Sequence, residues 1–166
     1  MTGSARHRVG QFWRHASARV TPEERANAED LLGPLAALFL ELPINDQRHG
    51  LDVLETVIRI EGQPSRLLQQ AALLHDVGKR GATFSVVERS LTVLLRATSP
   101  AALKAVLRSR PAFARRYAIY ADHARIGAER LRAAGADELA AIVAEHHAAE
   151  PRSEVTRQLQ SADGRN

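Results

Sequence analysis

The stretch that decides the fold is Ala-Leu-Leu-His-Asp-Val-Gly-Lys at residues 72–79, in which a run of helix-forming apolar residues meets an adjacent His75 and Asp76. Alanine and leucine favour helix, and glycine is common just past the last turn of one. We therefore expect a helix that carries this pair near its end and stops at Gly78. Imidazole and carboxylate groups directed into a core are costly unless they are paired, protonated or bound to a metal.

Further histidines and an aspartate continue apolar stripes of helical spacing on both sides of this stretch. They are His49, His123, His146 and Asp163. Nitrogen and carboxylate ligands in this mixture suit Fe, Mn, Zn or Co rather than Ca. Cysteine is absent, which excludes thiolate ligands. Two metal ions that share a bridging carboxylate could use all six residues.

Length and composition indicate a single all-α domain. The chain has 166 residues, of which 45% are hydrophobic, and it shows no strand-like alternation. We expect about eight helices. Three expectations concern helix ends: one helix from Pro22 to about Glu41, a cap at Asn45 or Asp46 for the next, and one long helix over 113–134 that ends at Gly135.

The net charge of +4 is matched by four arginines and no acid in the first twenty residues. The remainder is neutral overall, so the basic character indicates an N-terminal arm rather than a basic surface. Nucleic acid is therefore not the expected partner. No apolar run approaches the roughly 20 residues of a membrane span, and the N-terminus does not resemble a secretory signal. We expect a cytoplasmic protein that does not bind membranes.

From about Gln47 onward the sequence resembles the HD superfamily of metal-dependent phosphohydrolases, named for its adjacent His-Asp ligands. The H…HD…D pattern of that family matches His49, His75-Asp76 and Asp163. The additional His123 and His146 resemble the binuclear branch, which includes diadenosine tetraphosphate hydrolases and HD-GYP phosphodiesterases. A Gly-Tyr-Pro motif is missing after His146-His147, which disfavours an HD-GYP phosphodiesterase.

The resemblance implies a site with two divalent transition metal ions. His49, His75, Asp76 and Asp163 would hold the first ion, and Asp76 would bridge to a second ion held by His123 and His146. Asn45 stands where trinuclear relatives have a glutamate, which favours two ions over three. Lys79 is expected to contact substrate phosphate and, with Asp76, to serve catalysis.

His146 and His147 are adjacent, and neighbouring helical residues diverge by about 100°. We therefore expect only one of them to reach the metal in the usual way. His146 is favoured because it continues the stripe of Leu139, Ile142 and Val143. His147 is then a candidate for substrate contact.

The resemblance implies hydrolysis of a phosphate ester or anhydride in a small nucleotide-like molecule by metal-activated water. Two alternatives remain open: a regulatory or binding HD domain without turnover, and a di-iron oxygenase that uses the same ligand set. We expect residues 1–44 to form a basic arm and leading helix packed on an HD domain at 45–166. The oligomeric state stays open, a homodimer included.

Overall fold

The computed structural model describes residues 19–82, 84 and 86–166, and every regular element among them is helical. This confirms the predicted all-α fold. The α-helices are α2 (Pro22–Leu32), α3 (Ala36–Leu40), α4 (Ile44–Glu61), α5 (Arg66–Leu74), α6 (Val86–Thr98), α7 (Pro100–Ser109), α8 (Pro111–Ala121), α9 (His123–Ala133), α10 (Asp137–Glu145) and α11 (Glu154–Asp163). Two short 3-10 helices, η1 (Gly33–Leu35) and η2 (Val77–Lys79), complete the elements. Among the described residues, none of the helices combines the length and the hydropathy of a membrane-spanning segment.

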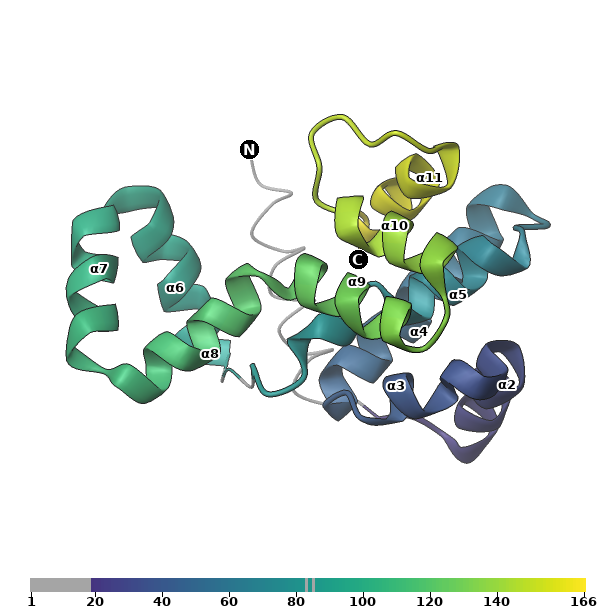
Figure 1. The fold of residues 1–166 in the computed structure, drawn as a ribbon, viewed down its shortest axis with the longest axis horizontal. Coiled ribbons are helices and arrows are strands. Elements are labelled where there is room, and N and C mark those ends of the chain that lie inside the picture. Colours follow the sequence, from purple (N-terminus) through teal and green to yellow (C-terminus); the bar gives the residue numbers. More distant parts are fainter. Residues whose placement is uncertain (1–18, 83, 85) are drawn as a thin grey trace.

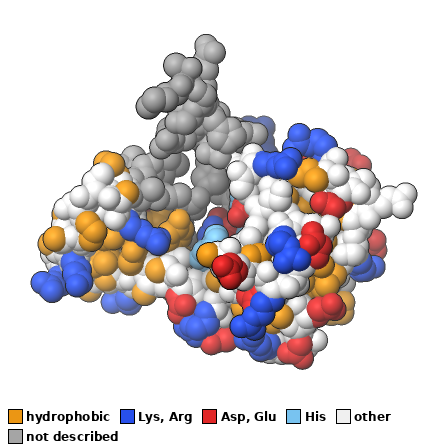
Figure 2. Space-filling view, turned by 90° about the horizontal axis from the view of Figure 1, so that it is seen from above, with side chains coloured by type: hydrophobic (Ala, Val, Ile, Leu, Met, Phe, Trp, Pro, Cys, Tyr) orange, Lys and Arg blue, Asp and Glu red, His pale blue; other side chains and the backbone are white. Residues whose placement is uncertain are grey.

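The helices divide into a bundle and a projecting lobe, as Figure 1 shows. Helices α2–α5 and α9–α11 form the bundle, and α6, α7 and α8 extend from its side. We call residues 86–121 the α6–α8 lobe. In the view from above in Figure 2, histidine side chains are visible in a hollow between the lobe and the bundle.

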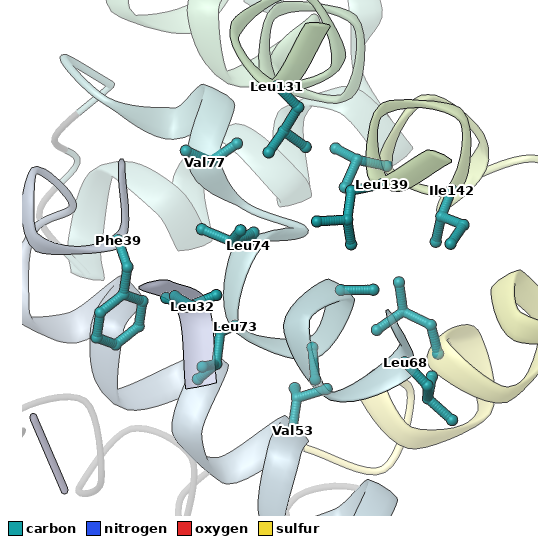
Figure 3. Close-up of a cluster of buried hydrophobic side chains, with 14 of the residues drawn as sticks. Leu32, Phe39, Val53, Leu68, Leu73, Leu74, Val77, Leu131, Leu139 and Ile142 are labelled. Carbon is teal, nitrogen blue, oxygen red and sulfur yellow. The ribbon is translucent and has the colours of Figure 1, made fainter. Parts of the chain in front are cut away.

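The core fills the bundle with leucine and valine side chains from successive helices, several of them drawn in Figure 3. Leu68, Leu73 and Leu74 of α5 are almost completely buried, and Leu131 of α9 packs into the same cluster. Burying each such side chain stabilises the fold by roughly 1.5–3 kcal/mol. The central position of α5 therefore fixes the place where the His75-Asp76 pair emerges.

The leading helices share this core. Leu32 of α2 and Phe39 of α3 are as deeply buried as the residues of α5. Helix α2 begins with a side-chain cap, because the Thr21 hydroxyl accepts a hydrogen bond from the Glu24 amide in a complete capping box. The boundary expected between residues 44 and 45 stays a prediction.

Several predicted helix ends were wrong. The helix expected from Pro22 to Glu41 is interrupted at Gly33, whose φ of 55° leaves the right-handed helical region. Helix α4 is preceded by Pro43 as its N-cap residue, so Asn45 and Asp46 lie inside the first turn rather than at the cap. Gly135, with a φ of 77°, follows α9 as expected.

The long helix expected over 113–134 is two helices, α8 and α9, that meet at Asp122. Neither glycine nor proline marks this break in the sequence. The Asp122 carboxylate accepts a hydrogen bond from Arg125 Nε at 2.8 Å, and an acid at this position also suits the positive end of the α9 dipole. The break places His123 at the first position of α9, a helix end rather than a helix middle.

Gly78 is a point of backbone-to-backbone contact. A Cβ atom there would lie 1.9 Å from the carbonyl oxygen of His123 and 2.6 Å from the amide nitrogen of Gly127. We expected Gly78 to stop a helix, but α5 already ends at Leu74 and the glycine instead lets η2 approach α9. Arg130 of α9 secures the same contact, because its Nη1 donates to the Val77 carbonyl at 2.8 Å.

Gly78→Ala is expected to destabilise the fold by about 3 kcal/mol, the upper end of the usual effect of overpacking, because the groups in the way are backbone. Urea unfolding followed by circular dichroism measures this change. The control is Gly164→Ala, whose nearest neighbour would lie at 3.2 Å and whose backbone is right-handed. Equal effects of the two substitutions would contradict the role assigned to Gly78.

Candidate metal centre

The side chains of the candidate site are presented mainly by helix ends. His75 caps the C-terminus of α5, His123 opens α9, His146 caps the C-terminus of α10, and Asp163 is the last residue of α11. His49 lies in the second turn of α4. Each of these helices buries an apolar face in the one core, so the ends that carry the polar groups converge. The structure thus brings together all six residues expected as metal ligands.

The first cluster is formed by His49, His75 and Asp76, whose candidate ligand atoms lie within 4.8 Å of one another. Asp163 joins it, because its Oδ1 lies 3.0 Å from His49 Nε2 and 3.8 Å from His75 Nε2. His75 is almost completely buried, whereas 25% of the Asp163 side chain is exposed. The cluster is therefore buried on one side and open on the other.

The second cluster is formed by His123, His146 and His147. The Nε2 atom of His123 lies 3.2 Å from that of His146 and 3.1 Å from that of His147. His123 and His146 are buried and His147 is exposed. The Nε2 atoms of three imidazoles thus face one another. The cluster they form is buried at His123 and His146 and open to solvent at His147.

Asp76 stands between the two clusters. Its Oδ2 lies 3.5 Å from His75 Nε2 and 3.9 Å from His49 Nε2, while its Oδ1 lies 3.3 Å from His123 Nε2. Lys79 reaches the same carboxylate, with its Nζ 2.5 Å from Oδ2. One carboxylate therefore faces both sets of imidazoles, as a bridging ligand must.

Backbone carbonyls orient the three buried imidazoles. The Nδ1 atoms of His75, His123 and His146 lie 2.9, 2.7 and 2.6 Å from the carbonyl oxygens three residues earlier in the chain. A carbonyl oxygen can only accept, so each Nδ1 carries a proton, and in the neutral ring the Nε2 atom then presents a lone pair. This arrangement is typical of histidines that bind metal through Nε2.

The donor set fits divalent transition metals. Among the described residues, His75 Nε2 is a buried nitrogen with no hydrogen-bond partner. A buried polar atom without a partner is costly, and a cation would satisfy it together with the neighbouring carboxylates. Imidazole nitrogens combined with a few carboxylates suit Fe, Mn, Co or Zn, as expected from the sequence.

Burial and charge give these groups protonation states suited to metal binding. Burial lowers the pKa of His75, and burial together with the repulsion that a protonated His75 would exert lowers the pKa of His146 to about 3. Burial opposes ionisation of Asp76, but Lys79 and the surrounding imidazoles hold the pKa of this carboxyl well below its usual value. His75 and His146 are thus neutral and Asp76 is charged near pH 7.

The Asp163–His49 pair carries the remaining charge of the first cluster. Burial would raise the pKa of Asp163, yet its hydrogen bond with His49 lowers that pKa to about 2. Burial would lower the pKa of His49, and the bond with Asp163 and the charge of Asp76 raise it instead. His49 must therefore lose a proton before its Nε2 can bind a cation.

His147 lies closer to the centre than expected. The divergence of adjacent residues applies to a continuous helix, but α10 ends at Glu145 and both histidines follow its last turn. The ring centroids of His146 and His147 lie only 3.9 Å apart, and both Nε2 atoms approach that of His123. No signal in the sequence marks this helix end, since Pro151 follows several residues later.

A family model described as Cas3, HD domain, matches residues 13–165 of this chain. The matched range includes all the helices described above and every residue of the two clusters. No match was found among curated proteins or among solved structures. The match confirms the expected HD-type metal-dependent hydrolase.

His147→Gln is expected to weaken binding of the second cation by at least about tenfold, because it removes one of three imidazoles that face one another. Titration calorimetry with Mn²⁺ measures the number of ions bound and their affinities. His7→Gln, at a histidine outside the described and matched residues, is the control. Unchanged affinity in His147→Gln would return this residue to the substrate-contacting role expected from the sequence.

The stability of the metal-free protein is expected to fall as the pH is lowered from about 6.5. An unfolded histidine takes up a proton near pH 6.5, whereas folded His146 stays neutral down to a pKa of about 3. The stability gained from this group is present above pH 6.5 and lost as the pH falls toward 3, with a slope of up to about 1.4 kcal/mol per pH unit. Urea unfolding between about pH 5 and pH 7 in a chelator measures the slope.

His146→Gln should flatten this dependence, because glutamine does not titrate. The variant is compared with the wild-type protein at each pH, so that any constant loss of stability cancels. Equal slopes in the two proteins would show that another group carries the pH dependence.

Proposed function

The chain belongs to the Cas3 HD-domain family, and we propose on this premise that it is a nuclease that hydrolyses phosphodiester bonds of nucleic acid with metal-activated water. From the sequence we expected a small nucleotide-like substrate and no nucleic acid. The expectation of no nucleic acid rested on the neutral average charge beyond residue 20, which does not identify the family. Membership of a family of nuclease domains supports a polymeric substrate instead.

The observation that carries the proposal is the position of Asp76 between two clusters of candidate ligands. His49, His75 and Asp163 would hold one cation together with Asp76. The second cluster, His123, His146 and His147, would hold another. When bound, a divalent cation lowers the pKa of coordinated water and stabilises charge on phosphoryl oxygens.

The protein's own residues supply orientation and compensating charge. Backbone carbonyls hold the imidazoles so that their Nε2 atoms face the centre. Lys79 is held by Asp76 and is only 14% exposed, so its ammonium group is fixed close to both clusters. From this position it would neutralise charge that develops on a phosphoryl oxygen during hydrolysis.

The open side of the site suits a large substrate. His147 is exposed, and the side chains of His49 and Asp163 are 23% and 25% exposed. Figure 2 shows histidine at the surface of the hollow beside the α6–α8 lobe. A phosphodiester could therefore reach the candidate ligands from this hollow without unfolding the bundle.

Asp76→Asn is expected to reduce nuclease activity by more than the roughly 100-fold loss typical of groups that only support a ligand. The assay follows cleavage of single-stranded and duplex DNA and RNA by the full chain with Mn²⁺, Co²⁺, Fe²⁺ or Mg²⁺. Asp137→Asn, an exposed acid at the start of α10, is the matched control and should keep wild-type activity.

A parallel panel of mononucleotides and dinucleotides identifies the alternative substrate class. Turnover of these small molecules with no cleavage of any polymer would contradict the nuclease and favour the small-molecule phosphohydrolase. Two bound cations without turnover of either class would contradict both enzymes and favour a binding domain.

A further inference from the structure

The charges of the chain are segregated along the sequence. Residues 89–121 contain seven lysines and arginines and no aspartate or glutamate. The rest of the described range, residues 19–88 and 122–166, contains thirteen basic and nineteen acidic residues. The neutral average beyond the first twenty residues therefore conceals one strongly basic segment on an acidic protein.

This basic segment coincides with the α6–α8 lobe, which projects from the bundle (Figure 1). Five of its basic residues are exposed and form no ion pair with other described residues: Arg96, Lys104, Arg108, Arg110 and Arg115. In Figure 2 the visible face of the lobe carries blue and orange side chains, whereas blue and red are mixed over the bundle. Unneutralised exposed cations on one element attract a polyanion.

A row of aromatic rings connects the lobe with the metal centre. The ring of Phe84 lies 5.6 Å from that of Phe113 and 5.5 Å from that of Tyr120, centroid to centroid. Tyr120 in turn stacks on His123 at 6.0 Å. The row thus leads from α8 to the second cluster of candidate ligands.

The three rings before His123 lie outside the buried core. Phe84, Phe113 and Tyr120 are each half-buried, and none belongs to the core cluster. Arg116 lies over Phe84 and Phe113 at 5.5 and 5.9 Å, and its hydrogen bond to Glu88 holds it there. Partly exposed aromatic rings beside cations are the features with which proteins bind unpaired bases and their phosphates.

We propose that the α6–α8 lobe, with the row Phe113–Phe84–Tyr120, binds a single-stranded nucleic acid and leads it to the metal centre. The basic side chains of the lobe contact the phosphates, and the aromatic rings contact the bases. A single strand is favoured over a duplex because stacking on these rings requires unpaired bases. Only one part of this inference rests on the proposed function: that the bound strand is led to the metal centre for hydrolysis.

The experiment measures strand binding separately from hydrolysis. Fluorescence anisotropy with a labelled single strand of roughly 20 nucleotides, in a chelator, gives the dissociation constant without cleavage. The lobe variant replaces Lys104, Arg108 and Arg115 by glutamine. The matched control replaces Arg25, Arg132 and Arg152, exposed arginines outside the lobe, so that both variants lose the same charge.

The lobe variant is expected to bind the strand about tenfold more weakly or worse, with the slope of log affinity against log salt reduced by up to about 2. The control should stay within about twofold of wild type. Phe113→Leu should weaken binding about fivefold or more and leave the salt slope unchanged, because stacking is lost and no charge is removed. Equal losses in the lobe variant and the control would overturn the proposal, as would tighter binding of a duplex than of the single strand.

Hydrolysis of bis(p-nitrophenyl) phosphate, a small diester with no strand to bind, reports on the metal centre alone. Wild-type rates in the lobe variant, together with its loss of strand binding, would support the proposal and show that the fold is intact. A wild-type protein that hydrolyses no diester, but binds the strand through the lobe, would contradict the proposed function and keep this inference. A wild-type protein that hydrolyses the diester, together with a lobe variant whose strand binding is unaltered, would support the proposed function and contradict this inference.

Discussion

The contact between Gly78 and the first turn of α9 is the constraint on which the candidate site depends. Because residue 78 has no side chain, the turn after His75-Asp76 can lie directly against the backbone of His123 and Gly127. This approach leaves Asp76 Oδ1 only 3.3 Å from His123 Nε2 and so joins the two clusters. Arg130 holds the turn from the same helix, which makes the distance between the clusters a property of backbone packing rather than of their own charges.

Concentrating so many polar groups beside a core is unfavourable unless each is satisfied. Three imidazoles meet this requirement on one side through the carbonyl oxygens of their own helix ends. Their other nitrogens face Asp76 or one another, and that of His75 has no hydrogen-bond partner among the described residues. A rigid set of lone pairs around a shared carboxylate is costly as it stands and is stabilised when cations bind, so stability and metal binding are linked in this fold.

The net charge of the chain does not reveal that basic residues are concentrated in the α6–α8 lobe. The net charge alone disfavoured nucleic acid as a partner. Every acidic residue of the described chain, however, lies outside residues 89–121, which leaves this segment strongly basic. The lobe also supplies the aromatic row that ends at His123. The same helix pair, α8 and α9, therefore carries both a candidate strand-binding surface and one of the candidate metal ligands.

The sequence by itself determined the helical fold and the identity of six converging residues, because helical periodicity and residue chemistry are local properties. Asp163 could be recognised in this way, as an acid that continues an apolar stripe. Only the tertiary structure decided the break at Asp122, the approach of His147 and the function of Gly78. No local signal marks the ends of α8 and α10, and a close approach between residues 78 and 123 depends on how distant helices pack, which spacing along a chain cannot reveal.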